Sequence, residues 1–305
     1  MAAFVIGILT SSLRLATPYL FAAIGETFSQ ASGVQNLGLD GIMLTSAYAA
    51  FYVAVTTGSL ALGILAAAVV GGVLGLVMAL VTVTMRADQG VSGIALYLFC
   101  LGLSELLFKQ TLGGVRTISG LKPVHIPGLS NIPVLGDILF QQNILVYVAF
   151  GLVPIAWFVL NRTPFGLKIR AVGENPHAAD SLGVRVGRIR YQTVTLGGVL
   201  AGIAGASLSI ALLNLFQPNL TNGMGFIAVA LVFFGGWRPV RVLLGALLFS
   251  TVNALQIWAQ VEGIGIPPYL TLMLPYVITI VVLATMRRRN TQAPSALTKP
   301  FERED

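Results

Sequence analysis

Charged residues are scarce in this chain of 305 residues: Asp, Glu, Lys and Arg together make up 10% of it. A soluble globular domain carries about 25% charged residues and about 45–50% apolar ones. Here 56% of the residues are apolar, and the mean hydropathy is +0.86. This composition excludes a soluble domain or a disordered chain, and it predicts an all-α polytopic membrane protein.

Several kinds of chemistry are also missing. Cys100 is the single cysteine, so the chain forms no internal disulfide, and His125 and His177 lie in separate loops, which argues against a metal site. No Gly-Lys pair occurs, which excludes a nucleotide-binding P-loop, and G-x-S-x-G and H-E-x-x-H are absent. We therefore expect no catalytic residues, no metal and no cofactor, and we do not expect an enzyme.

The net charge of +7 does not indicate nucleic-acid binding. The basic residues lie between the apolar runs and just after the last one, a distribution typical of the cytoplasmic side of a membrane protein. Few acidic residues lie inside the runs, whereas a proton-driven carrier usually needs a buried acidic relay. We expect another protein to supply the energy for any transport.

About nine apolar runs are candidates for membrane-spanning helices, which need roughly 17–25 residues. The seventh run is short, and the second and seventh begin in glycine-rich sequence, so either is a candidate for a broken or re-entrant helix. The runs are Phe4–Gly25, Leu39–Thr56, Leu60–Val83, Val91–Phe108, Ile144–Leu160, Tyr191–Leu213, Met224–Gly236, Val242–Val261 and Tyr269–Met286.

The distribution of Lys and Arg predicts the orientation. If the loop 161–190 is cytoplasmic, only Lys109, Arg116 and Lys122 face outside, and Arg14 lies within the first span. All other Lys and Arg residues then face the cytoplasm. This places the N-terminus outside and the C-terminus inside, in what we expect to be a bacterial inner membrane.

Opposite orientations of the first and last four spans predict an inverted repeat within one transmembrane domain, 1–305. The halves are 1–108 and 191–289, the fifth span connects them, 161–190 is a cytoplasmic loop, and 290–305 is a flexible tail. A weak internal sequence similarity supports the repeat: the Asn- and Gly-containing stretch Asn36–Gly41 leads into the second span, and a similar stretch, Asn219–Gly225, leads into the seventh.

Small residues recur at helical spacing in two of the runs. Gly71 and Gly75 form one G-x-x-x-G pair, and Gly198, Gly202 and Gly205 form a second small-residue face. Such faces let helix backbones approach closely in lipid, either within the chain or at a subunit interface.

The loop 161–190 contains a helix signature. Asn175 can cap a helix that starts with Pro176, and Gly183 can end it, which predicts a helix of about two turns from Pro176 to Leu182. An ordinary amphipathic surface loop is the alternative. The length and turn chemistry favour a fixed docking element.

Three motifs resemble those of ABC importer permeases that serve branched-chain amino acids, ribose-type sugars and nucleosides. The pattern T-x-F-G-x-x-I-R-A-V-G-E-N-P-x-A-A-x-x-x-G over 163–183 resembles their cytoplasmic coupling segment. The stretches Ser32–Leu44 and Gly223–Pro239 resemble the signatures of the two halves. One departure is Tyr97, where the nucleoside branch often carries Asn.

The resemblance implies a second permease subunit in a heterodimer, a cytoplasmic ABC ATPase, an external substrate-binding protein and surrounding membrane lipid as partners. It implies contact with the ATPase through the coupling segment. The residues expected to serve ATPase coupling are Arg170, Gly173, Glu174, Asn175, Pro176, Ala178 and Ala179.

Transport sites in inverted repeats lie near the bilayer midplane, where interrupted helices begin. A pathway with few charges favours a neutral, hydroxyl-rich solute, and aromatic rings can stack on a nucleobase. We therefore predict that the substrate is a nucleoside, with a ribose-type sugar as second choice and an apolar amino acid as third. The alternative class of protein is a secondary carrier. The expected pathway residues are Asn36, Asp40, Gly41, Tyr97, Asn222, Gly223, Gly225 and Phe234.

Overall fold

The computed structural model describes residues 2–124, 135–261 and 293–302, together with residues 273, 277 and 281. Over these residues the protein is all-helical, and the only strand-like feature is an isolated bridge between Thr117 and Leu215. Seven helices are long and apolar enough to cross a membrane, and they confirm seven of the predicted spans. The ninth, Tyr269–Met286, lies outside the described residues apart from three single positions.

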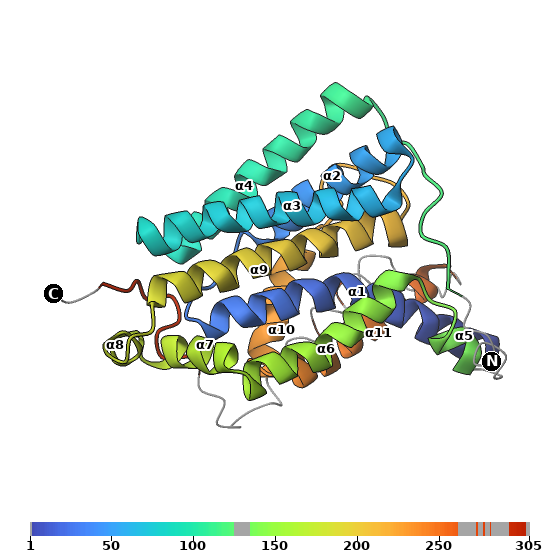
Figure 1. Ribbon diagram of the computed structural model, residues 1–305. Helices are drawn as coiled ribbons and strands as arrows, with labels where there is room; N and C mark the ends of the chain where they lie inside the picture. Colours follow the sequence, from blue (N-terminus) through green and yellow to red (C-terminus); the bar gives the residue numbers. More distant parts are fainter. Residues whose placement is uncertain are drawn as a thin grey trace.

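The helices run mostly alongside one another (Figure 1). Three of them continue into a π-helical turn, labelled η. The elements are α1 (Ala2–Ala31), α2 (Leu39–Thr57), α3 (Leu60–Ala79) with η1 (Leu80–Thr84), α4 (Gln89–Leu107) with η2 (Phe108–Leu112), α5 (Leu135–Leu139), α6 (Ile144–Arg162), α7 (Pro164–Glu174), α8 (Pro176–Ser181), α9 (Val186–Ala206) with η3 (Ser207–Leu212), α10 (Met224–Gly235) and α11 (Pro239–Val261).

Helix α10 is the short seventh run of the sequence. Its 12 residues span about 18 Å at 1.5 Å per residue, which is too short for a hydrocarbon core of about 30 Å. Figure 1 shows α10 crossing steeply behind α1 and α9 instead of running parallel to them. It is therefore a partial span, as the glycine-rich start of this run predicts.

The contacts between helices fall into matching pairs. Helix α1 packs against α9, α2 packs against α3 and α9, and α10 packs against α11 and α1. Helix α3 packs on α9 as α11 packs on α1. Exchanging α1 with α9, α2 with α10 and α3 with α11 converts each of these contacts into another that is present, which is the relation expected of two half-repeats.

Glycines bring α3 and α9 into close contact near the centre of the bundle. A Cβ atom added to Gly71 would lie 2.7 Å from the Cα atom of Gly202. One added to Gly75 would lie 2.9 Å from the Cα atom of Gly198 and 3.0 Å from the carbonyl oxygen of Val194. The small-residue faces thus serve packing within the chain.

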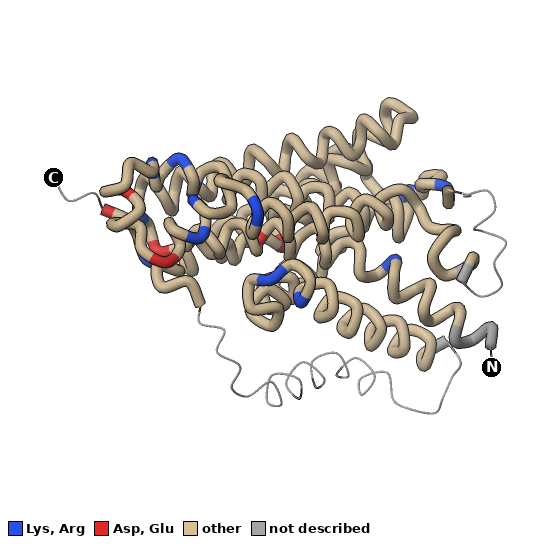
Figure 2. The backbone as a smooth tube through the Cα atoms, turned by 60° about the horizontal axis from the view of Figure 1, so that its bottom comes forward, with Lys and Arg blue, Asp and Glu red and all other residues tan. Residues whose placement is uncertain are grey.

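Charge is concentrated at one end of the molecule. Figure 2 shows most Lys, Arg, Asp and Glu residues at the end that holds α7, α8 and the C-terminus, with few at the opposite end. Between these ends, α3 and α4 expose large apolar side chains such as Leu65, Val73 and Phe99. An apolar belt between a charged end and a sparsely charged end is the surface expected of a protein embedded in lipid.

Candidate functional site

The segment between α6 and α9 folds into two helices at the charged end. The predicted helix is confirmed as α8, in which Pro176 occupies the first turn and Asn175 Oδ1 accepts a hydrogen bond from the backbone N–H of Ala178 at 3.0 Å. Gly183 follows with a φ of +81°, a left-handed conformation that glycine adopts without strain. The short helix therefore has a defined start and a defined end.

Helix α7 precedes α8 and was not expected from the sequence. Thr163 caps it by accepting a hydrogen bond from the N–H of Gly166 at 3.2 Å, and Pro164 follows in its first turn. The signal was a Thr-Pro pair of the same kind as the Asn-Pro pair that predicts α8. Ile169 and Val172 of α7 are buried, so one face of this helix is part of the protein core.

Gly173 fixes α7 against the end of α1. Its Cα faces the carbonyl group of Ala31, and a Cβ atom would also lie 3.4 Å from the side chain of Pro294. Ala31 is the last residue of α1, so any side chain at position 173 would push α7 away from that helix. Gly173 is therefore a point of close contact between α7 and the end of α1.

Several residues of the two helices are exposed. Among the residues expected to serve coupling, Arg170, Glu174, Asn175 and Ala178 are exposed, whereas Gly173 and Ala179 are buried. Leu182, directly after α8, exposes 84% of its surface. An exposed leucine just after a fixed helix can anchor a partner protein, and Leu182 is not among the residues that the resemblance implies for coupling.

The C-terminal tail contacts these helices directly. The sequence predicts a flexible tail, but the structure gives its residues 293–302 defined hydrogen bonds. The N–H of Ala296 donates to the carbonyl of Gly173 at 2.9 Å, and Ser295 Oγ donates to Glu174 Oε2 at 3.1 Å. The tail thus lines the side of α7 that faces the membrane-spanning helices.

Arg190 ties the same tail to α9 and to the turn after α1. Its side chain is buried at 1% exposure, and it donates to the carbonyls of Ser32 at 3.2 Å and Lys299 at 3.1 Å. The N–H of Thr298 donates to the carbonyl of Gly33 at 3.2 Å. Two further contacts hold the end of the tail, an ion pair between Arg86 and Glu302 at 2.7 Å and a ring contact between His177 and Phe301 at 5.1 Å.

The starts of α2 and α10 meet inside the protein through Asp40. This side chain is fully buried; its Oδ1 accepts from the N–H of Gly225 at 2.7 Å, and its Oδ2 accepts from Thr221 Oγ1 at 3.0 Å. A carboxylate at a helix N-terminus satisfies free N–H groups and interacts favourably with the helix dipole. Asp40 thus joins the start of α2, which is long enough to cross a membrane and is not interrupted, to the start of the short helix α10.

A second buried carboxylate links α1 to both of these helices. Glu26 Oε1 accepts from the N–H of Asn36 and from Gln30 Nε2, both at 2.9 Å. Gln30 Oε1 in turn accepts from Trp237 Nε1 at 2.9 Å, just beyond the end of α10. Both ends of α10 are therefore hydrogen-bonded to the first half of the chain.

The expected pathway residues fall into two groups in the structure. Asn36, Asp40, Gly41 and Gly225 are buried in the contact between α2, α4 and α10. Tyr97, Gly223 and Phe234 are half-buried, and Asn222 is exposed. Tyr97 also packs edge-on against Phe226 with ring centroids 5.2 Å apart, so part of its surface already has a partner.

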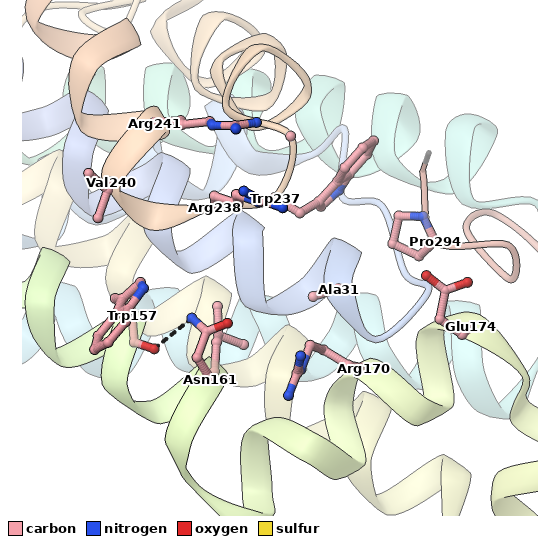
Figure 3. Close-up of a pocket in the computed structure, with 12 residues that line it drawn as sticks. Ala31, Trp157, Asn161, Arg170, Glu174, Trp237, Arg238, Val240, Arg241 and Pro294 are labelled. Atoms are coloured by element: carbon pink, nitrogen blue, oxygen red, sulfur yellow. Dashed lines mark hydrogen bonds between the residues drawn. The ribbon is translucent and has the colours of Figure 1, made fainter. Parts of the chain in front are cut away.

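Two hollows flank the α7–α8 unit. One of about 340 Å³ is lined by Phe165, Lys168, Arg185, Arg188 and neighbouring residues of the α8–α9 turn. The other, of about 650 Å³, lies on the opposite side between α6, α7 and the start of α11 (Figure 3). Both are rich in arginine or lysine, which gives this end of the molecule a basic surface.

Comparison with known proteins assigns the fold to a family. The sequence model of a family described as the permease component of branched-chain amino acid transport systems matches residues 8–283. The chain belongs to this family. It is therefore a permease subunit of an ATP-binding-cassette importer, a class in which the ATPase and the substrate-binding protein are separate partners, and it is not a stand-alone secondary carrier.

Three relatives are similar over nearly the whole permease. A nucleoside ABC transporter permease of Lactococcus lactis is 39% identical over 91% of each chain, and a guanosine ABC transporter permease of Bacillus subtilis is 36% identical over 96% of each. A putative glucose ABC transporter permease of Haloferax volcanii is 37% identical over 99% of each. No solved structure gives a significant match.

Proposed function

We propose that this permease carries nucleosides across the membrane as one half of a heterodimeric channel. The observation that carries this proposal is the similarity, over nine-tenths or more of the chain, to two permeases named for nucleosides or guanosine. A simple sugar is the second candidate, because an equally similar relative is named for glucose. The neutral, partly aromatic surface of Tyr97, Asn222 and Phe234 suits both kinds of solute.

The second permease would complete the pathway. Asp40, Gly41 and Gly225 are engaged within this chain, so they fix the starts of α2 and α10 and leave substrate contact to the residues that remain partly exposed. Tyr97, Asn222 and Phe234 would then face the partner subunit across the channel.

ATP-driven closure would reach this chain through α7 and α8. Asn175, Ala178 and Leu182 leave the surface of α8 open, with Leu182 as an apolar anchor, while Gly173 on the buried side of α7 touches the end of α1. An ATPase that moves α8 therefore moves a membrane-spanning helix. This assignment places the charged end and the C-terminus in the cytoplasm and the N-terminus outside, in agreement with the distribution of Lys and Arg.

Uptake by the complete complex tests the substrate. Proteoliposomes that hold both permeases, the ATPase and the binding protein should take up labelled nucleoside, and unlabelled nucleosides should compete more strongly than glucose, ribose or leucine. If a sugar competes and nucleosides do not, the nucleoside assignment is wrong and the transporter class is unaffected.

Leu182→Ser tests the coupling surface. We expect nucleoside uptake to fall at least tenfold with normal membrane insertion, because an exposed anchor residue contributes about 2 kcal/mol or more to a protein interface and 1.4 kcal/mol is tenfold. Leu213→Ser is the matched control, since Leu213 is 44% exposed and follows η3 at the opposite end of α9. Equal uptake by the wild type and both variants would remove Leu182 from the docking surface.

Cysteine labelling tests the orientation in a Cys100→Ala background. Gly114 has open space around it and Ser181 is exposed at the end of α8, so both positions accept a cysteine. A membrane-impermeant reagent should label Gly114→Cys in intact cells and Ser181→Cys only after the membrane is opened. The reverse pattern would invert the proposed topology.

A further inference from the structure

The hollow of about 650 Å³ beside α7 has two basic walls. Figure 3 shows Arg238, just before α11, and Arg241, in the first turn of α11, on one side of it and Arg170 of α7 on the other. Glu174 is the carboxylate among the lining residues, and it already accepts a hydrogen bond from Ser295. The space is therefore bordered by three guanidinium groups and by one carboxylate that already accepts a hydrogen bond.

These arginines have no carboxylate partner in the part of the chain that the structure describes. The ion pairs found there are Arg86 with Glu302 and Lys109 with Glu105, and neither involves a residue of this hollow. Arginine presents a planar fork of donors that matches the geometry of a phosphate group. Three such groups around one space are suited to a phosphate-bearing ligand.

Apolar surface leads away from the hollow along the bundle. Val240 lines it, and Leu244 and Leu248 follow at intervals of four residues on the same face of α11, with exposures of 48%, 62% and 45%. On the other wall, Trp157 of α6 is 41% exposed and neighbours Phe158, which is 55% exposed. A ligand with a charged head and a long apolar part would match both surfaces at once.

We propose that this hollow binds the head group of an anionic phospholipid from the inner leaflet. Its phosphate would lie between Arg170, Arg238 and Arg241, and an acyl chain would follow the stripe formed by Val240, Leu244 and Leu248. Basic pockets between membrane-spanning helices on the cytoplasmic side favour anionic lipids, and tryptophan is favoured at the same depth. Trp157 and Trp237 both line the hollow.

The bound lipid would bridge α6 and α7 on one wall and the α10–α11 turn on the other. The assignment of this lipid to the inner leaflet depends on the proposed orientation, in which this end of the chain is cytoplasmic. Binding itself needs neither transport nor ATP, so it can be measured whether or not the nucleoside assignment holds.

Lipid binding to the purified full chain tests the proposal. After delipidation, phosphatidylglycerol or phosphatidylcholine is added back, and the retained lipid is measured by native mass spectrometry. We expect retention of phosphatidylglycerol over phosphatidylcholine and about fivefold weaker phosphatidylglycerol binding in Arg238→Gln and in Arg241→Gln, since each basic residue near an anionic surface contributes about that factor. Arg188→Gln, which removes an equal charge from the other hollow, should bind as the wild type does.

A second readout locates the lipid. The chain has three tryptophans, and Trp258→Phe leaves only the two that line the hollow. Phosphatidylglycerol brominated on its acyl chain should quench their fluorescence, and Arg241→Gln should abolish most of the quenching.

Three results would overturn the proposal. The first is equal retention of the two lipids, and the second is an equal loss in Arg188→Gln and Arg241→Gln, which would indicate general surface attraction. The third is complete displacement of phosphatidylglycerol by an equal concentration of glycerol phosphate, which would make a soluble phosphate compound the ligand.

Discussion

Replacing Asp40 should show whether its carboxylate joins the two half-repeats or meets the transported solute. In Asp40→Ala the N–H of Gly225 and the hydroxyl of Thr221 lose their shared acceptor in a fully buried site. Each unsatisfied buried donor costs about 1–3 kcal/mol, and hydrogen bonds to charged groups lie at the upper end. We therefore expect the free energy of unfolding to fall by about 3–6 kcal/mol.

Asp40→Asn should be far milder. The amide oxygen can still accept from Gly225 N–H, and the amide NH₂ can donate to Thr221 Oγ1, since a hydroxyl both donates and accepts. Only the charge is lost, which should cost about 1 kcal/mol. Thr221→Val removes one of the two hydrogen bonds, so its loss of unfolding free energy should lie between those of Asp40→Asn and Asp40→Ala.

The assay is unfolding in mixed detergent micelles with increasing sodium dodecyl sulfate, followed by circular dichroism, together with uptake by the reconstituted complex. A structural role predicts that Asp40→Asn keeps most of its uptake. Wild-type stability of Asp40→Ala, or equal destabilisation by Ala and Asn, would refute the reasoning. Loss of uptake in a stable Asp40→Asn protein would instead place this carboxylate on the transport pathway.

Two further predictions concern packing and the tail. Gly71→Ala should lower the free energy of unfolding by about 1–3 kcal/mol, because its Cβ would force α3 away from α9. Gly102 has open space around it, so Gly102→Ala should be neutral or slightly stabilising. Unfolding in detergent measures both variants, and equal effects would contradict the close packing of α3 on α9. Deleting residues 293–305 should lower uptake more than ATP hydrolysis, because α7 and Arg190 lose their contacts to the tail. Arg86→Gln breaks only an exposed ion pair with the tail and should change the free energy of unfolding by less than about 1 kcal/mol. An unchanged ratio of uptake to ATP hydrolysis after the deletion would show that the tail is dispensable.

Local signals in the sequence predict the helices well. Apolar run length gives the positions of the membrane-spanning helices, and the cap at Asn175 with Pro176 gives α8 to within a residue. Helix α7 is missed because only about half of its residues are apolar, so it lacks the continuous apolar run by which the membrane-spanning helices are found, although Thr163 and Pro164 mark its start.

Contacts between distant residues are much harder to predict. The hydrogen bond between Asp40 and Gly225 joins residues 185 positions apart, and nothing in either local sequence specifies the partner. The inverted repeat supplies part of this information, because it indicates that the starts of the second and seventh spans lie near the midplane. The contacts of the tail are equally hard to predict. Its sequence is polar with few apolar residues, yet it hydrogen-bonds to backbone carbonyls of other segments, such as those of Gly33 and Gly173.

The hydrogen bonds at the two ends of α10 lead to a last prediction about coupling. Asp40 holds its start, and Trp237, just beyond its end, donates to Gln30 of α1 at 2.9 Å. Gly173 of α7 touches the same helix α1 at Ala31, so we expect a movement of the proposed coupling helices, α7 and α8, to reach α10 through α1.

Trp237→Phe removes this indole N–H and keeps an aromatic ring beside Phe233. Loss of one neutral hydrogen bond should cost about 1 kcal/mol of unfolding free energy, which leaves the protein folded. We expect the number of nucleosides taken up per ATP hydrolysed to fall, because α10 no longer follows α1. Trp258→Phe makes the same chemical change in the part of α11 that packs against Gly7, far from Gln30, and should leave this ratio unchanged. An unchanged ratio in Trp237→Phe would mean that α10 follows the coupling helices without this hydrogen bond, through its packing against α1, α2 and α11.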